Sequence, residues 1–241
     1  MFSYLYNNLV FNPLYNGLIY LMDLLPWIDA GIAVIIFTII IRLILFPLSK
    51  KAVVTQVRMK EIEPELNRIK RDIPDKQKQA MAVMDLYRTK GVNPFSSILV
   101  LFIQLPIIWA LYSIFSRSGL PIVKETLLYP FVSVPTIDMI FLGIVDIGAA
   151  SIILAAIAAL SQYLQLHFSF ASMPATTKSD NPSLDMAQDM MKNMKYVFPV
   201  IVFIISYKIS AVIALYWTIS SLFTLGQEIV VRKHLKNHQP L

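Results

Sequence analysis

The sequence predicts an all-α polytopic membrane protein with five transmembrane helices, an N-terminal interfacial amphipathic helix and a cytoplasmic helical hairpin between spans 1 and 2. Hydrophobic residues make up 56% of the 241 residues, and the mean hydropathy is +0.62. Several long runs without acidic residues approach the roughly 20 apolar residues that a spanning helix needs. The 21 lysines and arginines lie almost wholly outside those runs. A soluble domain is therefore excluded.

The first predicted element, residues 1–27, contains no lysine or arginine and places apolar residues at helical spacing among tyrosines and asparagines. We expect an external amphipathic helix that lies in the membrane interface, with its tyrosines at the level of the lipid headgroups. The competing interpretation is an extra spanning helix. Asn12, Asn16 and Asp23 disfavour it because their polar side chains would have to enter lipid.

Span 1 is predicted over residues 28–48 and contains Arg42 inside its apolar run. An arginine near the middle of a spanning helix costs about 2.5–3.5 kcal/mol on insertion scales. Two interpretations are open for this stretch alone. The side chain of Arg42 either extends to the cytoplasmic headgroups, or a wet cavity in the protein receives it.

The cytoplasmic hairpin is predicted over residues 49–93, which hold eleven lysines and arginines. Apolar residues recur there every three or four positions, which predicts two helices packed along a narrow seam. A proline should bend the first helix and Gly91 should end the second. The hairpin residues are Met59, Ile62, Pro64, Leu66 and Ile69 in the first arm and Ala80, Met84 and Tyr87 in the second.

Four further spans are predicted over residues 94–115, 148–167, 195–207 and 211–231. They are separated by an external loop at 116–147, a cytoplasmic loop and helix start at 168–194, and an external turn at 208–210; a basic cytoplasmic tail follows at 232–241. Spans 4 and 5 have few residues between them, so they should be short or thin the bilayer. An alternative span at residues 128–145 would place Asp138 in lipid and invert the topology after it.

The orientation follows from the distribution of positive charge. Seventeen lysines and arginines fall in the predicted cytoplasmic segments or at their edges. Only Arg117, Lys124 and Lys208 fall in the predicted external segments, and the twenty-first is Arg42 in span 1. Because cytoplasmic loops are enriched in lysine and arginine, the N-terminus is expected outside and the C-terminus inside.

Polar residues gather in the predicted cytoplasmic halves of spans 1, 3 and 5. If these faces converge, they form a water-filled groove that opens to the cytoplasm and holds one uncompensated positive charge. Such a charge attracts anions strongly because it is screened less than in bulk water. The candidate groove residues are Thr38, Arg42, Gln162, Gln165, Trp217, Ser220 and Thr224. Gln104 in span 2 is explained equally well by pairing with backbone groups that Pro106 disrupts.

Six segments, in order along the chain, resemble the YidC/Oxa family of membrane protein insertases. The resemblance covers nearly the whole chain from about residue 11. Arg42 matches the family's single groove arginine, and Gln165 and Trp217 match polar and aromatic groove positions. The segments are IRLILFPLSKK (41–51), EIEPELNRIK (61–70), LYRTKGVNPF (86–95), FIQLPIIWALY (102–112), MKYVFPVI (194–201) and ALYWTISSLFTLGQ (214–227).

The resemblance implies a five-span insertase of the bacterial cytoplasmic membrane that uses no nucleotide, cofactor, metal or covalent chemistry. Its partners would be membrane lipid and newly made membrane proteins with short, often acidic translocated tails. The ribosome and the Sec translocon are further candidate partners, and DNA is not one. The groove arginine would draw the tail part-way in while the apolar segment of the client slides along lipid-facing residues. For this hydrophobic slide the sequence offers Ile107, Ile108, Phe198, Val202 and Ile205.

Two parts of the chain depart from the family pattern. The turn Lys208-Ile209-Ser210 replaces a link that usually contains proline or glycine, so the resemblance does not fix the end of span 4. The family's large external domain and long basic tail have no counterpart in these residues. Partner contacts through those two parts are therefore not implied.

A membrane assembly scaffold and a small transporter are the alternative functions. A scaffold leaves the cost of Arg42 unexplained, and a transporter would want buried carboxylates, broken helices or internal repeats. An enzyme is disfavoured because the sequence has no HExxH, GxSxG or GxxxxGK motif. It also has no cysteine and only three scattered histidines.

Overall fold

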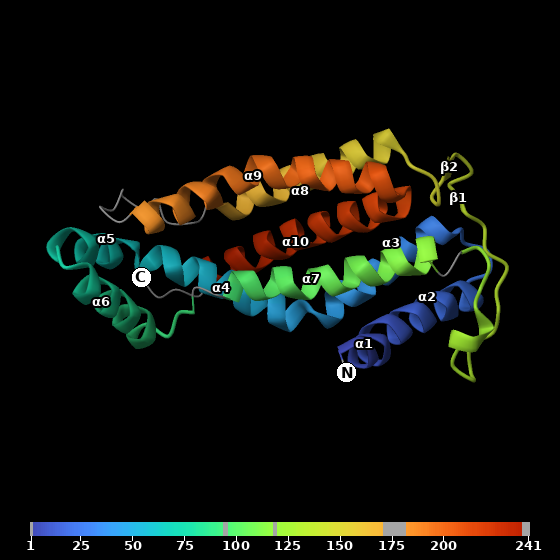
Figure 1. The fold of residues 1–241 in the computed structure, drawn as a ribbon, viewed down its shortest axis with the longest axis horizontal. Coiled ribbons are helices and arrows are strands. Elements are labelled where there is room, and N and C mark those ends of the chain that lie inside the picture. Colours follow the sequence, from blue (N-terminus) through green and yellow to red (C-terminus); the bar gives the residue numbers. More distant parts are fainter. Residues whose placement is uncertain (1, 94–95, 118–119, 171–181, 238–241) are drawn as a thin grey trace. The chain divides into compact units, whose positions relative to one another are not determined.

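The computed structural model describes residues 2–93, 96–117, 120–170 and 182–237, which fall into two compact units. Unit 1 comprises residues 1–45, 101–162 and 199–223, and unit 2 comprises residues 46–100, 163–198 and 224–241. Residues 171–181 of the predicted cytoplasmic loop and residues 238–241 of the predicted tail lie outside the described residues. Both units are mainly helical, as the sequence predicted (Figure 1).

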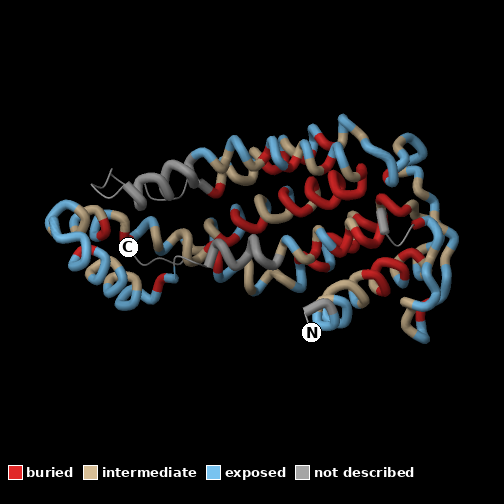
Figure 2. Tube along the Cα trace, in the orientation of Figure 1, coloured by how far each residue is buried: buried red, intermediate tan, exposed pale blue. Residues whose placement is uncertain are grey.

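Unit 1 combines N-terminal helices, one apolar helix, the connecting segment 120–151 and parts of four longer helices. These elements are α1 (Phe2–Tyr6), η1 (Asn7–Phe11), α2 (Asn12–Leu24), α3 (Ala30–Ile44), α7 (Ser96–Tyr112), η2 (Ser113–Arg117), η3 (Glu125–Leu127), β1 (Ile140–Phe141), β2 (Val145–Asp146), α8 (Ile152–Phe170), α9 (Pro182–Ile209) and α10 (Ala211–Asn237). One hydrophobic core joins α2, α3, α7, segment 120–151 and α10. Residues 211–218 of α10 are all buried, which makes this half-helix the centre of the unit (Figure 2).

The N-terminal helix turns part of its polar side into unit 1. The tyrosines of this helix were expected at an outer surface, but Tyr15 is fully buried. Its hydroxyl accepts a hydrogen bond from the N–H of Lys124 at 2.8 Å. Burial raises the pKa of Tyr15. The buried Asn16 donates to the carbonyl of Leu127 (2.9 Å) and accepts from the N–H of Tyr129 (2.6 Å). The burial of Tyr15 and Asn16 was not predicted because helical periodicity separates polar from apolar residues and does not show which polar groups have hydrogen-bond partners.

Segment 120–151 contains a small β-hairpin that the all-α prediction missed. β1 and β2 are antiparallel, with Ile140 opposite Asp146 and Phe141 opposite Val145. Leu142 (φ 53°) and Gly143 (φ 69°) form the turn. In the described stretch 128–151 no residue is helical, so the alternative span at 128–145 is wrong. The periodicity of a short apolar run does not distinguish a strand from a helix. Here the turn at Gly143 reverses the chain and favours two paired strands.

The start of α10 is held by the same segment, 120–151. The N–H groups of Ala211 and Val212 donate to the carbonyls of Ala149 (2.8 Å) and Ile147 (3.1 Å). These bonds satisfy donors that a helix N-terminus otherwise leaves unpaired. The predicted turn at 208–210 is shorter in the structure, because α9 continues to Ile209 and only Ser210 separates it from α10.

Unit 2 contains the charged hairpin, built from α4 (Phe46–Glu61), α5 (Glu63–Asp72) and α6 (Lys76–Thr89). The predicted bend is present: the helix breaks at Ile62, and Pro64 lies in the first turn of α5, where proline is tolerated. Asp75 caps α6 by accepting from two backbone N–H groups, and Gly91 follows the helix with a φ of 63°. The described hairpin therefore starts and stops at the residues that favour those positions.

The seam between α5 and α6 differs from the prediction in its second arm. Ile62 and Leu66 are buried, while Met59, Ile69 and Tyr87 are half-buried. Ala80 and Met84 are exposed, and the buried position on α6 belongs to Gln79. Its amide donates to the carbonyls of Lys70 (2.8 Å) and Ile73 (3.1 Å) at the end of α5. The prediction counted only apolar residues as inward-facing, whereas a glutamine here satisfies carbonyls that α5 leaves unbonded.

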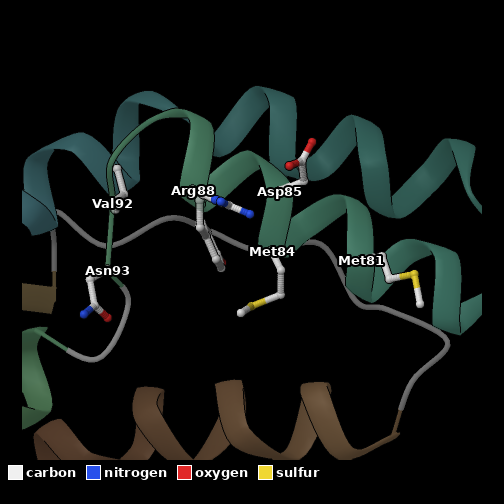
Figure 3. Close-up of a pocket in the computed structure, with 7 residues that line it drawn as sticks. Met81, Met84, Asp85, Arg88, Val92 and Asn93 are labelled. Atoms are coloured by element: carbon white, nitrogen blue, oxygen red, sulfur yellow. The ribbon is translucent and has the colours of Figure 1, made fainter.

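An open pocket of about 590 Å³ lies along α6 (Figure 3). Its walls combine methionine and tyrosine carbon with the opposite charges of Asp85 and Arg88. The lining residues are Met81, Met84, Asp85, Tyr87, Arg88, Val92 and Asn93. Met84 thus faces this pocket instead of the seam.

By length and hydropathy, one described helix can cross a bilayer by itself, through residues Ile152–Ser169 of α8. A second is found if α3 and α4 count as one broken span, and the apolar stretch Gln104–Phe115 is shorter. The break between α3 and α4 falls at Leu45, just before Phe46-Pro47. Proline removes a helical N–H and disfavours helical geometry in the residue before it, so the predicted span at 28–48 is interrupted.

Candidate functional site

Arg42 lies in the last turn of α3 and keeps only 8% of its surface exposed. The apolar face of α3 at Ala33, Val34, Phe37 and Ile41 packs into the core of unit 1. Arg42 follows Thr38 by four residues, so it continues a buried face of the same helix. The guanidinium is therefore held among other helices of the unit. It does not extend freely along the surface.

The partners of Arg42 are neutral. Its Nε donates to the hydroxyl of Ser220 at 2.7 Å, and its Nη2 donates to Ser220 and to Gln104 Oε1, the latter at 2.8 Å. Gln104 Nε2 donates in turn to the hydroxyl of Tyr216 at 2.6 Å. The resulting network joins α3, α7 and α10 through one charged and three uncharged side chains. We call Arg42, Gln104, Tyr216 and Ser220 the arginine cluster.

The charge of the arginine cluster is not compensated within the part of the chain that the structure describes. No described aspartate or glutamate forms an ion pair with Arg42. Its hydrogen bonds use Nε and Nη2, and no described residue accepts one from Nη1. A buried charge normally has a counter-charge because desolvation is costly. Within the described part of the chain, the arginine cluster thus keeps a positive charge and two Nη1 N–H donors that no residue occupies.

A second polar cluster lies on the neighbouring face of α10. Trp217 Nε1 donates to Gln162 Oε1 at 2.7 Å, and the hydroxyl of Ser221 donates to the same oxygen at 3.1 Å. All three side chains are buried. Ala155 and Ala158 on α8 are also buried, and their small side chains are of the kind that lets helices approach closely.

The two clusters follow from the spacing of residues on α10. Tyr216 and Ser220 are four residues apart and contact Gln104 of α7, while Trp217 and Ser221 are also four apart and contact Gln162 of α8. Residues four apart share a helix face, and consecutive residues lie about 100° apart. One helix therefore presents two different polar faces to two neighbours.

The other predicted groove residues take different places. Thr38 is buried, and its hydroxyl donates to the carbonyl of Val34 in its own helix at 2.6 Å. Gln165 and Thr224 belong to unit 2, where Gln165 donates to Ser169 at 2.9 Å. Within unit 1 the structure thus brings Arg42 together with Ser220, and Gln162 together with Trp217.

Sequence reasoning missed Gln104 and Tyr216. Gln104 was explained equally well by pairing with backbone near Pro106, but its side chain instead bonds to the side chains of Arg42 and Tyr216. Its position within an apolar run, like that of Arg42, was the available signal. Tyr216 had a weaker one, since it stands one helical turn before Ser220.

Two of the five predicted slide residues are not lipid-facing. Ile107 and Val202 are buried, whereas Ile108, Phe198 and Ile205 are half-buried. Their segments are apolar on every side, so the sequence holds no contrast that would identify the outer face. In unit 1 the large exposed apolar residues of α7 and α9 are Leu105, Trp109, Val200, Ile201, Ile204 and Tyr207.

Unit 2 has a buried ionic network of its own. The Glu228 carboxylate accepts from the Ser169 hydroxyl at 2.6 Å and pairs with Arg232 at 3.4 Å. The Arg232 guanidinium lies 5.0 Å from the ring centre of Phe168 and within 3.5 Å of Gln56 Oε1. Burial lowers the pKa of Arg232, and the Glu228 carboxylate opposes that shift. This arginine has the counter-charge that Arg42 lacks among the described residues.

Comparison with known proteins identifies the family. A family model described as 60Kd inner membrane protein matches residues 22–238. The chain is 30% identical over 215 residues to the membrane protein insertase YidC of Clostridium tetani, covering 88% of this chain and 86% of that protein. It is 34% identical over 204 residues to the membrane protein insertase YidC of Fusobacterium nucleatum, with 84% and 86% covered.

A solved structure has the same fold. It is an active YidC insertase crystal structure with the first transmembrane domain resolved, and it matches with a TM-score of 0.55 and 25% sequence identity. The match covers 90% of this chain and 45% of the other, so this chain spans less than half of that protein's length. The resemblance seen in the sequence motifs is thereby confirmed: the chain belongs to the 60Kd inner membrane protein family, which includes the YidC membrane protein insertases.

Proposed function

We propose that this protein inserts other proteins into the bacterial cytoplasmic membrane and that Arg42 attracts the acidic translocated tails of its clients. The observation that carries the proposal is a buried arginine whose described partners are serine and glutamine and include no carboxylate. In a family of insertases, a charge kept without a counter-ion is suited to an anion that arrives from outside the protein. No nucleotide, metal or covalent step is needed.

The mechanism follows from what holds the guanidinium. Ser220 and Gln104 orient Arg42 without neutralising it. A client carboxylate that reaches Nη1 gains a charge-assisted hydrogen bond, which is stronger than a neutral one. In the proposed groove, open to the cytoplasm and formed by a five-span core, this attraction offsets part of the cost of moving a polar tail into the membrane. Arg42 then acts as a transient counter-charge.

The apolar segment of the client is proposed to move along exposed apolar side chains of α7 and α9, including Leu105, Trp109 and Ile204. These replace Ile107 and Val202 as slide residues. The basic hairpin is proposed to stand in the cytoplasm, where its lysines and arginines attract anionic lipid and ribosomal RNA. The ribosome and the Sec translocon remain proposed partners.

Insertion by the purified protein tests this function directly. Proteoliposomes that contain the chain are expected to protect the translocated tail of a short-tailed, single-span client from external protease, several-fold above protein-free liposomes. A soluble protein of matched size controls for vesicle leakage. Protection at the level of protein-free liposomes, with the chain folded and correctly oriented, would exclude an insertase that works alone.

The orientation is tested separately by labelling. Because the sequence has no cysteine, each introduced cysteine is the only thiol. We expect an impermeant maleimide to label position 123 in intact cells and to label positions 70 and 236 only after permeabilisation. This follows from the distribution of lysine and arginine. Labelling of position 70 in intact cells would overturn the proposed topology.

A further inference from the structure

The tip of the β-hairpin exposes apolar side chains where soluble turns carry polar ones. Residues 139–145 read Met-Ile-Phe-Leu-Gly-Ile-Val and contain no charge; Asp138 and Asp146 flank them. Leu142 keeps 61% of its surface exposed and Ile144 keeps 82%. The hairpin contributes Phe141 and Val145 to the core of unit 1, so the outward direction of the other two is fixed by its register.

The backbone at Leu142 makes the choice of residue more unusual. Its φ of 53° lies in the left-handed region, which glycine, asparagine and aspartate occupy readily and leucine does not. The leucine therefore adds backbone strain while most of its side chain gains no contact inside the protein. A side chain of this kind is explained by an apolar environment outside the chain.

Hydrogen bonds to the start of α3 fix the position of the hairpin tip along the axis of that helix. Leu142 N–H donates to Asp29 Oδ2 at 3.0 Å, and Oδ1 of the same carboxylate caps α3 by accepting from Ile32 N–H at 2.8 Å. The N–H of Ala30 donates to the carbonyl of Asp138 at 2.8 Å. The ring of Phe141 fills the space above Gly31, where a Cβ atom would collide with it. The hairpin is thus attached at the residue where α3 begins (Figure 1).

We propose that Leu142 and Ile144 insert into the acyl chains of the outer leaflet and fix the depth of the outer end of unit 1. The inference rests on the proposed role of α3 as a membrane span, because the tip is bonded to the start of α3 and therefore lies at the membrane boundary. Ile152 and Ile153 at the start of α8 and Trp27 just before α3 are further exposed apolar residues of unit 1. Tryptophan is typical of membrane interfaces. The occupant is lipid, with Asp138 and Asp146 left at the headgroups.

Spin labels in proteoliposomes of phosphatidylethanolamine and phosphatidylglycerol test the proposal. Three single-cysteine variants are compared: Ile144→Cys at the tip, Thr136→Cys at an exposed polar position of the same external segment, and Ile40→Cys at an exposed position of α3. Collisions with oxygen report lipid and collisions with a water-soluble nickel chelate report water. We expect the label at position 144 to collide several-fold more with oxygen than with nickel, and the label at position 136 to show the reverse.

The label on α3 separates failure of the inference from failure of the proposed span. If position 40 reports lipid while position 144 reports water like position 136, the tip does not insert and the inference is overturned. If position 144 is immobilised and reached by neither reagent, a protein covers the tip, which also overturns it. If position 40 reports water, α3 is not a span, and the tip inference falls with that premise.

Discussion

Arg42→Ala is expected to slow insertion of a client with an acidic translocated tail by roughly 30-fold. At an effective dielectric constant of about 20, two unit charges ~8 Å apart attract each other by about 2 kcal/mol, which corresponds to that factor. The same client with its acidic residues replaced by amides should change by less than about twofold, because the lost interaction needs a carboxylate. The measurement is the rate of tail protection in proteoliposomes.

Two further substitutions separate charge from shape. Arg42→Lys should retain much of the activity, since attraction needs a positive charge more than the planar guanidinium, although the Nε bond to Ser220 is lost. Arg42→Glu should reduce acidic-tail insertion to the background of protein-free liposomes. Lys208→Ala is the matched control, because it removes one exposed positive charge elsewhere and should leave both tails unaffected.

The result that would refute the attractor is equal loss for acidic and neutral tails in Arg42→Ala. Arg42 would then be a structural residue that holds α3, α7 and α10 together through Ser220 and Gln104. Normal insertion by all three Arg42 variants would instead mean that the side chain has no part in the reaction.

Arg232→Leu is expected to destabilise the protein by about 3 kcal/mol or more, because it leaves the carboxylate of Glu228 buried without its partner. The side chains of Arg232 and Glu228 are only 12% and 4% exposed, so water cannot solvate the carboxylate that remains. The measurement is the free energy of unfolding in detergent micelles on titration with a denaturing detergent. Ser169 still donates to Glu228 in the variant and limits the loss.

Arg232→Leu, Glu228→Leu and the double variant form a double-mutant cycle, and Glu228→Gln is a separate, milder change. Glu228→Gln should cost less than Arg232→Leu, since the amide oxygen can still accept from Ser169 and Arg232, and the guanidinium left without a counter-charge is more exposed than the carboxylate and keeps Gln56 as a partner. The double variant Glu228→Leu/Arg232→Leu should recover to within about 1–2 kcal/mol of the parent, as buried ion pairs replaced by apolar residues often do. Equal destabilisation of the single and double variants would show that packing, and not the charge pair, accounts for the effect.

Most of the helical fold was predictable because the physical signals are strong. Long apolar runs, the basic stretch at 49–93, Pro64 and Gly91 each act locally, and the structure has helices, a break and a helix end at the corresponding places. Arg42 stood out for the same reason: a charge in an apolar run is expensive whatever surrounds it.

Rotation about the helix axis was much harder to predict. Gln104 was correctly seen as polar within an apolar run, yet its partner depends on which way α7 turns, and α7 has no polar stripe to show it. Ile107 and Val202 were misassigned for the same reason. The β-hairpin was missed because its apolar run is too short for periodicity to separate strand from helix, and it is anchored by Asp29 and Ala30, more than 100 residues away.

The single-residue link at Ser210 has a consequence for how this protein tolerates insertions and deletions. α10 starts immediately after Ser210, and the carbonyls of Ile147 and Ala149 fix that start. Each residue added or removed between this anchor and Tyr216 turns the remainder of α10 by about 100°. That is the angle between its two polar faces, so one inserted residue would point the serine that holds Arg42 toward α8 and bring Ile219 to the arginine. A change of length at this place therefore differs from one in an ordinary turn between helices, because it changes which side chains of α10 face Arg42 and Gln162.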